Sequence, residues 1–305
     1  MMRSKRQAQA TPAGGSADTY AAPIVAGPAG GQAEGIASDT SVELRFANVH
    51  KSFASPGGAA FPAVENISLD IERGTFNCVI GPSGCGKSTL LNMAAGLMRP
   101  TSGEVVYRGE LLTQTNDQVG YMTQQSLLLP WRTLEKNIGI ALELRRVPRA
   151  ERKRRVADML ARVGLEGFER RYPAQLSGGM QKRAAIARTL IYEPDTLLMD
   201  EPFGALDAQL KLVLQRELLA LWERDRKTVI FVTHDLEEAM LLGDRVIVFG
   251  SSPGRIIHIE NITFSRPRDL VQLRSEPEFA EMWERLWKLL DPRSKEVARA
   301  NGDSR

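Results

Sequence analysis

The residues best suited to chemistry form the segment Gly81-Pro82-Ser83-Gly84-Cys85-Gly86-Lys87-Ser88-Thr89. It follows the apolar run 76–80, which is typical of a buried strand, and it precedes an apolar, helix-like stretch at 90–97. Glycines let the backbone fold so that successive N–H groups point inward, and the helix adds the positive end of its dipole. The pattern therefore predicts a loop that binds the phosphates of a nucleoside triphosphate.

Each polar side chain of this loop has an expected task. Lys87 should reach the β- and γ-phosphates, Ser88 should ligate Mg²⁺ through its hydroxyl, and Thr89 should contact the α- or β-phosphate. The alternative is a glycine-rich turn that precedes a helix by chance, and the strand before it and the helix after it argue against that alternative.

Two acids form a second chemical group. Asp200 and Glu201 follow the apolar segment 196–199, which predicts a strand. The carboxyl ends of parallel strands meet at one edge of a sheet, so both acids should lie where the phosphate loop opens. Asp200 is expected to hold the water shell of Mg²⁺, and Glu201 is expected to act as the general base for an attacking water. The alternative is an acidic pair that caps a helix.

A second glycine-flanked helix start is present at Leu176-Ser177-Gly178-Gly179-Met180-Gln181. Such a helix N-terminus attracts anions. Here the chain resembles the ATP-binding-cassette (ABC) ATPases, whose signature motif reads LSGGQ, with Met180 at the usual glutamine position. In that family the signature of one subunit closes over the γ-phosphate held by the other. The resemblance therefore implies a head-to-tail homodimer that holds two ATP molecules, each contacted by Ser177, Gly178 and Gly179 of the facing subunit.

The other motifs of the family follow in its usual order. Gln124 matches the Q-loop, Asp207 the D-loop, and His234 the switch histidine. The resemblance implies that Gln124 and His234 take part in catalysis, with Gln124 also near Mg²⁺, and that Asp207 lies at the nucleotide. A lone histidine after a strand is otherwise more often structural. Phe53 resembles the aromatic that stacks on adenine, although Phe61 competes for this role and a bare phenylalanine is usually core.

Further segments, less specific than the nucleotide-binding motifs, indicate which branch of the family the chain resembles. The stretch 125–134, with Leu128-Leu129-Pro130-Trp131, is apolar for a loop beside charged helices and suggests a docking surface. In the family this region receives the membrane subunits. The segments 200–209, 252–256 and 266–269 also resemble the nitrate, sulfonate and taurine importers. The resemblance implies an ATP-hydrolysing subunit at the cytoplasmic face of the membrane, working with permease subunits and an external solute-binding protein.

The remaining sequence predicts an α/β fold with a mostly parallel P-loop core. We expect a disordered extension at 1–40, an ABC ATPase domain at 41–265 and a C-terminal helical extension at 266–305. The alternating segments 42–46 and 67–71 predict an antiparallel β subdomain, and 101–118 is a polar, glycine-containing stretch. The composition of about 125–190 predicts an inserted helical subdomain. The C-terminal helix either packs on its own domain or makes a regulatory or dimer contact.

Charge and cysteine usage exclude several classes. The formal net charge of the 305 residues is only +3, so nucleic acid is not an expected partner. No apolar run approaches the roughly 18 residues that a membrane-spanning helix needs. Two cysteines, Cys78 and Cys85, give no disulfide framework and fit a reducing cytoplasm. Cys85, near a helix N-terminus, is expected to be partly ionised, open to alkylation and protected by ATP.

One rival function belongs to another class. Some members of the resembled family are soluble ATPases that act on nucleic acid or the ribosome. Those usually carry two cassettes or a long coiled coil, and this chain has one signature and no sustained heptads. The resemblance implies that specificity resides in the binding protein and the membrane subunits, so a nitrogen oxyanion, an organosulfonate, a pyrimidine precursor or another small molecule all stay open as the solute. An exporter subunit also stays open as an alternative.

Overall fold

The structure, a computed structural model, describes residues 41–54, 58, 60–125, 128–204 and 206–291. The expected disordered extension at 1–40 and the last part of the C-terminal extension, 292–305, lie outside the described residues. So do Ser126 and Leu127 of the apolar loop and Ala205, the first residue of the D-loop Ala205-Leu206-Asp207.

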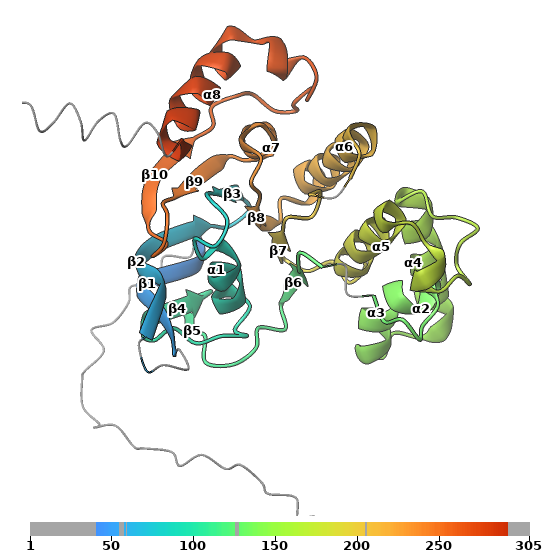
Figure 1. The fold of residues 1–305 in the computed structure, drawn as a ribbon. Helices are drawn as coiled ribbons and strands as arrows, with labels where there is room; N and C mark the ends of the chain where they lie inside the picture. The colour runs from blue at the N-terminus through green and yellow to red at the C-terminus, as the bar shows by residue number, and fades with distance from the viewer. Residues whose placement is uncertain (1–40, 55–57, 59, 126–127, 205, 292–305) are drawn as a thin grey trace, which may run out of the picture. The chain divides into compact units, whose positions relative to one another are not determined.

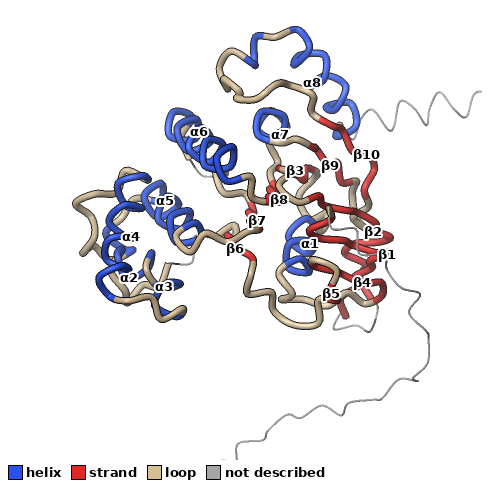
Figure 2. The backbone as a smooth tube through the Cα atoms, turned by 180° about the vertical axis from the view of Figure 1, so that it is seen from behind, coloured by secondary structure: helices blue, strands red, loops and turns tan. Residues whose placement is uncertain are grey.

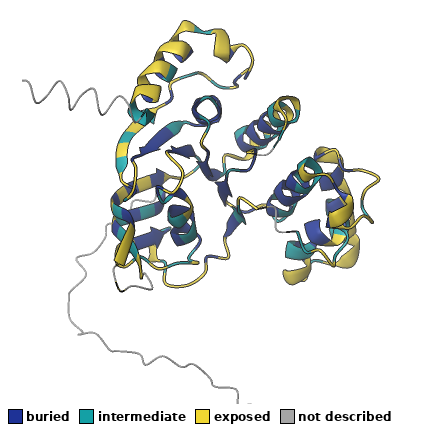
Figure 3. Ribbon diagram, in the orientation of Figure 1, coloured by how far each residue is buried: buried dark blue, intermediate teal, exposed yellow. Residues whose placement is uncertain are grey.

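A six-stranded sheet forms the centre of the fold, in the order β10-β9-β3-β8-β7-β6 (Figure 1). Its strands are β3 (Phe76–Ile80), β6 (Val119–Met122), β7 (Thr196–Asp200), β8 (Thr228–Val232), β9 (Arg245–Phe249) and β10 (Ile256–Asn261). All neighbours are parallel except β10, which runs antiparallel to β9. β3, β7 and β8 are buried at every position, as expected for strands covered on both faces (Figure 3). The prediction of a mostly parallel α/β core is confirmed.

A smaller antiparallel sheet has the order β2-β1-β4-β5. It consists of β1 (Val42–Ala54), β2 (Ala60–Glu72), β4 (Ser102–Tyr107) and β5 (Glu110–Leu111). β1 and β2 contain the predicted strand segments 42–46 and 67–71 and extend well beyond them. The polar stretch 101–118, in which the sequence indicates no strand, contains β4, which pairs with β1 and buries Val105, Val106 and Tyr107. Local polarity did not reveal a strand that depends on a partner distant in sequence.

A helical segment lies between β6 and β7. It contains α2 (Leu134–Ile138), α3 (Ile140–Leu144), α4 (Arg149–Arg162), the 3₁₀ helix η1 (Pro173–Gln175) and α5 (Gly178–Leu190). Figure 2 shows these helices grouped together and joined to the sheet at β6 and β7. They enclose their own core, which includes Leu134, Leu160 and Ala184. On α5, Ala185 and Ile186 instead face the core of the sheet, so this helix serves two cores.

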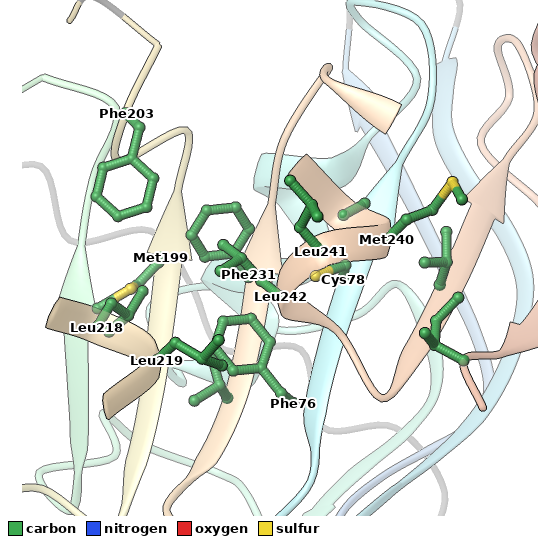
Figure 4. Packing of buried hydrophobic residues seen from close by; sticks show 14 of the residues in the cluster. Phe76, Cys78, Met199, Phe203, Leu218, Leu219, Phe231, Met240, Leu241 and Leu242 are labelled. Atoms are coloured by element: carbon green, nitrogen blue, oxygen red, sulfur yellow. The ribbon is translucent and has the colours of Figure 1, made fainter. Parts of the chain in front are cut away.

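Alternation along β3 divides the apolar side chains between the two faces of the main sheet. Phe76, Cys78 and Ile80 pack with α6 (Ala208–Asp225) and α7 (Leu236–Leu242), as Figure 4 shows for several of them. Val79 faces α1 (Lys87–Ala94) and the antiparallel sheet. The period of two in a strand explains this division.

The C-terminal segment packs on the same core. α8 (Pro277–Leu290) follows the 3₁₀ helix η2 (Leu273–Ser275), and it buries Phe279, Met282 and Leu286 with the residues of α7. Arg268 donates hydrogen bonds from Nη1 to the carbonyl oxygens of Leu241 (3.1 Å) and Gly243 (2.7 Å), so it caps the C-terminus of α7. A cation is favourable at this end of a helix dipole.

Phe231 is the aromatic at the centre of this core, with ring centroids 5.7 Å from both Phe76 and Phe203. We expect Phe231→Ala to lower the free energy of unfolding by about 3–5 kcal/mol, because a fully buried ring leaves a cavity that the sheet cannot close. Chemical denaturation measures this. Val213→Ala, at a half-exposed position on α6, is the control and should change stability little. Equal effects of the two substitutions would contradict this packing.

Candidate functional site

The loop Gly81 to Thr89 connects β3 with α1, as the sequence predicted. Gly84 and Gly86 have φ angles of 77° and 94°, in the left-handed region that glycine adopts without strain. A Cβ atom on Gly86 would lie 2.4 Å from Cγ1 of Val64 on β2, so no larger residue fits there. Backbone freedom and close packing together hold the loop in a tight turn at the start of α1.

Lys87 lies at the centre of this loop. Its Nζ donates hydrogen bonds to the carbonyl oxygens of Gly81 and Pro82, both at 2.8 Å. The residue is 7% exposed, whereas Pro82, Ser83 and Gly84 are exposed. The arrangement places a buried ammonium group under an open backbone turn, which suits an anion with several oxygens.

The loop that contains Ser252 and Gly254 packs against the phosphate loop. Ser252 Oγ donates to the carbonyl oxygen of Gly84 at 3.2 Å. A Cβ atom on Gly254 would lie 1.9 Å from the carbonyl oxygen of Cys85, so the two backbones touch. In the sequence these residues are only markers of a branch of the family. Their contact with the phosphate loop arises from the fold.

The thiol of Cys85 was expected to be accessible and partly ionised, and the structure shows otherwise. Its side chain is 1% exposed, and burial raises the pKa of the thiol although the Lys87 ammonium lowers it in part. The prediction of an ionised, accessible thiol is therefore wrong: the loss of water outweighs the nearby positive charge.

We expect both cysteines to resist alkylation in the native protein, because Cys78 is also buried and burial raises its pKa. Thiol titration at pH 8 should detect little reaction before denaturant is added and two thiols afterwards, the two that the sequence contains. Rapid native labelling of Cys85, located by peptide mapping, would show that the loop opens.

Asp200 lies at the end of β7, 5% exposed. Burial raises the pKa of its carboxyl group, while a hydrogen bond with Ser88 and the charges of Lys87 and Lys182 act in the opposite direction. The fold thus joins a hydroxyl from α1 to a carboxylate from β7. These are hard oxygen donors of the kind that Mg²⁺ prefers, so the pair fits this ion. Within the described ranges, no group of three His, Cys, Asp or Glu residues forms a further metal site.

Asp200→Asn tests the cost of this buried charge. Because the native pKa is raised, the folded chain holds the Asp200 proton more tightly than the unfolded chain does. The stability that this proton provides is present at low pH and is lost as pH rises from 3.8 through the raised pKa. We expect Asn to raise the free energy of unfolding more at pH 7 than at pH 4, and to lower hydrolysis about 10²- to 10³-fold.

Denaturation curves at the two pH values measure the difference. The control is Asp117→Asn, at an exposed carboxylate. An equal gain or loss at pH 4 and pH 7 for Asp200→Asn would contradict a charge cost.

Three polar side chains meet beyond Asp200. Glu201 Oε2 accepts a hydrogen bond from Gln124 Nε2 at 3.2 Å and lies 3.3 Å from His234 Nδ1. Glu201 has a φ of 47°, and its N–H donates to Val232 O at 2.9 Å. A non-glycine residue in this conformation carries strain that often marks a functional site. The ends of β6, β7 and β8 therefore bring together the three residues that the sequence singled out.

Lys182 of α5 is a member of this site that sequence reasoning missed. Its Nζ donates to the carbonyl oxygens of Gln124 (2.6 Å) and Glu201 (3.4 Å). Burial lowers its pKa, and the charges of Asp200 and Glu201 partly offset this. The available signal was a lysine at helical spacing from Ala185 and Ile186, on the apolar face of α5.

The signature and the D-loop occupy two exposed helix starts. Ser177 caps α5 by accepting a hydrogen bond from Met180 N (3.2 Å), and Asp207 caps α6 by accepting one from Leu210 N (3.0 Å). A Cβ atom on Gly179 would lie 3.1 Å from Leu210, so the two starts are neighbours. In the described part of the chain no hydrogen bond or ion pair joins Ser177 or Asp207 to the phosphate loop.

Phe53 and Phe61 face each other at the adjoining ends of β1 and β2. Their exposed fractions are 39% and 55%, so neither is a core residue. Lys51 Nζ lies 5.4 Å from the centroid of the Phe53 ring. β2, which carries Phe61, also carries Val64, and Val64 packs closely against Gly86 of the phosphate loop.

Comparison with known proteins gives the family. The family model described as ABC transporter matches residues 64–204. An uncharacterised ABC transporter ATP-binding protein of Methanocaldococcus jannaschii is 47% identical over 82% of this chain and 91% of its own length. The taurine import ATP-binding protein TauB of Roseobacter denitrificans is 37% identical over 86% and 98%. The nitrate import ATP-binding protein NrtD of Synechococcus elongatus is 42% identical, over 242 residues that make up 78% of this chain and 88% of the relative.

A solved dimeric structure of a bacterial ABC transporter cassette matches with a TM-score of 0.67 and 34% identity, over 73% of this chain and all of that one. The chain belongs to the family of ABC transporter ATP-binding proteins, and it is an ATP-binding ATPase of that family. None of the helices described between residues 41 and 291 is long and apolar enough to cross a bilayer.

Proposed function

We propose that this protein is the ATP-hydrolysing subunit of an ABC importer for a small solute such as nitrate, a sulfonate or taurine. It works at the cytoplasmic face of the membrane with permease subunits and an external solute-binding protein. The observation that carries the proposal is the meeting of Gln124, Glu201 and His234 beside the phosphate loop. Relatives named as taurine and nitrate import ATP-binding proteins support the importer role.

The phosphate loop binds the nucleotide. The Lys87 ammonium exchanges the carbonyl oxygens of Gly81 and Pro82 for phosphate oxygens, and the backbone N–H groups of residues 83–89 surround the anion. Thr89 adds a hydroxyl contact. Phe53, with Phe61 opposite, offers an exposed ring on which adenine stacks.

Ser88, Asp200 and Gln124 hold Mg²⁺ at this site. When bound with ATP, Mg²⁺ neutralises charge on the phosphates. The raised pKa of Asp200 supports its role, since a carboxylate that burial penalises gains more from a cation than an exposed one does.

Glu201 acts as the general base. Its Oε2 atom is already oriented by Gln124 and by His234, so the carboxylate is fixed before a water molecule is deprotonated. His234 contacts the γ-phosphate from its 60% exposed position. Lys182 anchors the backbone on both sides, because it binds the carbonyl oxygens of Gln124 and Glu201.

Two subunits complete each site in a head-to-tail dimer. Ser177, Gly178 and Gly179 stand at an exposed N-terminus, where the dipole of α5 favours the γ-phosphate of the facing subunit. Asp207 lies beside them at the start of α6. A relative of known structure is described as a dimer, which supports this assembly.

The permease subunits dock beside the Q-loop. In the described part of the 125–134 stretch, Trp131 is 71% exposed and Pro130 is also exposed. Asn137 Oδ1 accepts from Leu129 N (2.7 Å) and its Nδ2 donates to Arg132 O (2.9 Å), so the loop is held by its own helix. An exposed tryptophan on a braced loop is a typical anchor of a protein interface.

Glu201→Gln tests the base. We expect it to bind ATP, to lose about 10²- to 10³-fold in kcat, as loss of one preorganised group does, and to accumulate as an ATP-bound dimer. Lys87→Ala should instead lose nucleotide affinity or turnover. The control is Glu217→Gln, which removes a half-buried carboxylate on α6. ATPase assays and size-exclusion chromatography read the result, and normal turnover by Glu201→Gln would refute the assignment.

The trapped Glu201→Gln dimer also tests the importer role. Tagged protein with ATP should recover a multi-span permease from solubilised membranes, and the associated binding protein can then be screened with nitrate, sulfonates and taurine. Recovery of ribosomes or nucleic acid would replace the importer with the rival soluble ATPase and leave the hydrolytic site intact.

A further inference from the structure

A buried carboxylate holds the residue that precedes His234. Glu238 lies in the first turn of α7 and is 3% exposed. Its Oε2 atom accepts a hydrogen bond from Thr233 Oγ1. Its Oε1 atom accepts one from Gln215 Nε2 of α6 at 2.8 Å, and Lys211 Nζ lies 3.3 Å away. Both oxygens of this charge are therefore satisfied inside the protein.

The residue that follows His234 is held by the same group. Asp235 Oδ2 accepts from Lys211 Nζ at 2.7 Å, and Asp235 N donates to Thr233 Oγ1 at 3.0 Å. Its Oδ1 atom caps α7 by accepting from Glu238 N at 3.2 Å. Burial raises the pKa of Asp235, but the hydrogen bond and charge of Lys211 outweigh it and leave the pKa below the ordinary value.

His234 itself is held in a different way. Its side chain is 60% exposed, and its contact among the described residues is Nδ1 to Glu201 Oε2. The imidazole direction therefore depends on the backbone that Thr233 and Asp235 fix on either side. An ion bonded on all sides in a low-dielectric interior is hard to displace, since each lost partner leaves a buried charge unsatisfied.

Thr233, Asp235, Glu238 and Lys211 form a bonded group around His234, here called the clamp, and this clamp joins α6 to α7. Lys211 and Gln215 lie one turn apart on α6, whose first residue follows Asp207, while Glu238 and Asp235 belong to the start of α7. The ion pairs tie the loop that carries His234 to the helix that begins at the exposed Asp207. If α6 moved, the ion pairs of Lys211 with Asp235 and Glu238 would pull the loop that carries His234 in the same direction.

We propose that Glu238 is a positioning residue for hydrolysis, which directs His234 toward Glu201 and the γ-phosphate by holding Thr233 and, through Lys211, Asp235. This inference rests on the proposed function. The role is separate from the phosphate loop, from the acids at the end of β7 and from the contacts of the signature.

Thr233→Val removes the hydroxyl at nearly constant volume, and Thr233→Ser keeps it. We expect Val to lower kcat on the order of 10- to 100-fold with little change in KM for ATP, because a misplaced group affects the transition state more than substrate binding. Ser should recover most of kcat. A merely structural loss would follow side-chain volume, so Ser, which removes a methyl group, would then be impaired at least as much as Val, or kcat and KM would change together.

Imidazole NMR provides a readout independent of turnover. The chain contains three histidines, His50, His234 and His258, so each signal can be assigned by substitution. In Thr233→Val the His234 signal should shift, because its ring leaves Glu201, while those of His50 and His258 stay in place as internal references. Adding Glu201→Gln should shift the His234 signal less in the Val background than in the wild type.

Glu43→Gln is the matched control. Glu43 is a carboxylate of β1 that is 1% exposed and accepts hydrogen bonds from Tyr107 (3.0 Å) and Thr196 (2.9 Å). This change should lower stability and leave kcat and the His234 signal unchanged. If Thr233→Val fails to fold, Lys211→Met replaces it, because Lys211 is only partly buried and its loss should shift the same signal.

The outcomes separate the two proposals. If the wild type has no ATPase activity, the proposed function is wrong. The shift of the His234 NMR signal in Thr233→Val would still test whether the clamp positions His234. Normal ATPase activity, with kcat and the His234 signal unchanged in both Thr233→Val and Lys211→Met, would overturn the role of Glu238 and leave the proposed function standing.

Discussion

Parallel strand pairing is the constraint on which the site depends. β7 pairs with β6 on one side and with β8 on the other, and in the second pair Asp200 lies opposite Val232. Because all three strands run the same way, the residues that follow them emerge at one edge of the sheet. Gln124 and Glu201, 77 residues apart in sequence, thereby form a hydrogen bond. A shift of one residue in the register would separate them and turn their side chains to opposite faces.

Buried charge is the cost of this arrangement. Lys87, Asp200, Lys182 and Glu238 are each nearly inaccessible to water, and each is compensated by carbonyl oxygens, hydroxyls or an opposite charge. When a phosphate arrives, the Lys87 ammonium would exchange its two carbonyl oxygens for phosphate oxygens, so its charge would stay compensated. Burial raises the pKa of Asp200, so an ionised carboxylate at this position lowers the stability of the fold at neutral pH.

Two helices connect the interior with the exposed motifs. α5 begins at Ser177 and carries Lys182 to the carbonyl oxygens of the site, while α6 begins at Asp207 and carries Lys211 to the clamp around His234. The fold thus places one charged group on each helix about one turn beyond its exposed start. A partner that contacts either helix start would therefore lie about one helical turn from one of these charged groups.

The sequence by itself determined the phosphate loop, the acids at the end of β7, the signature and the α/β class, because short-range spacing and apolar periodicity specify these features locally. Only the tertiary structure decided the remainder. β4 forms in a polar stretch because β1 supplies its partner. Cys85 is buried, with its backbone against Gly254, and burial raises the pKa of its thiol. Lys182 and Glu238 acquire their roles from groups 58 and 23 residues away, Gln124 and Gln215. Burial and long-range pairing are properties of the folded chain, and no local pattern encodes them.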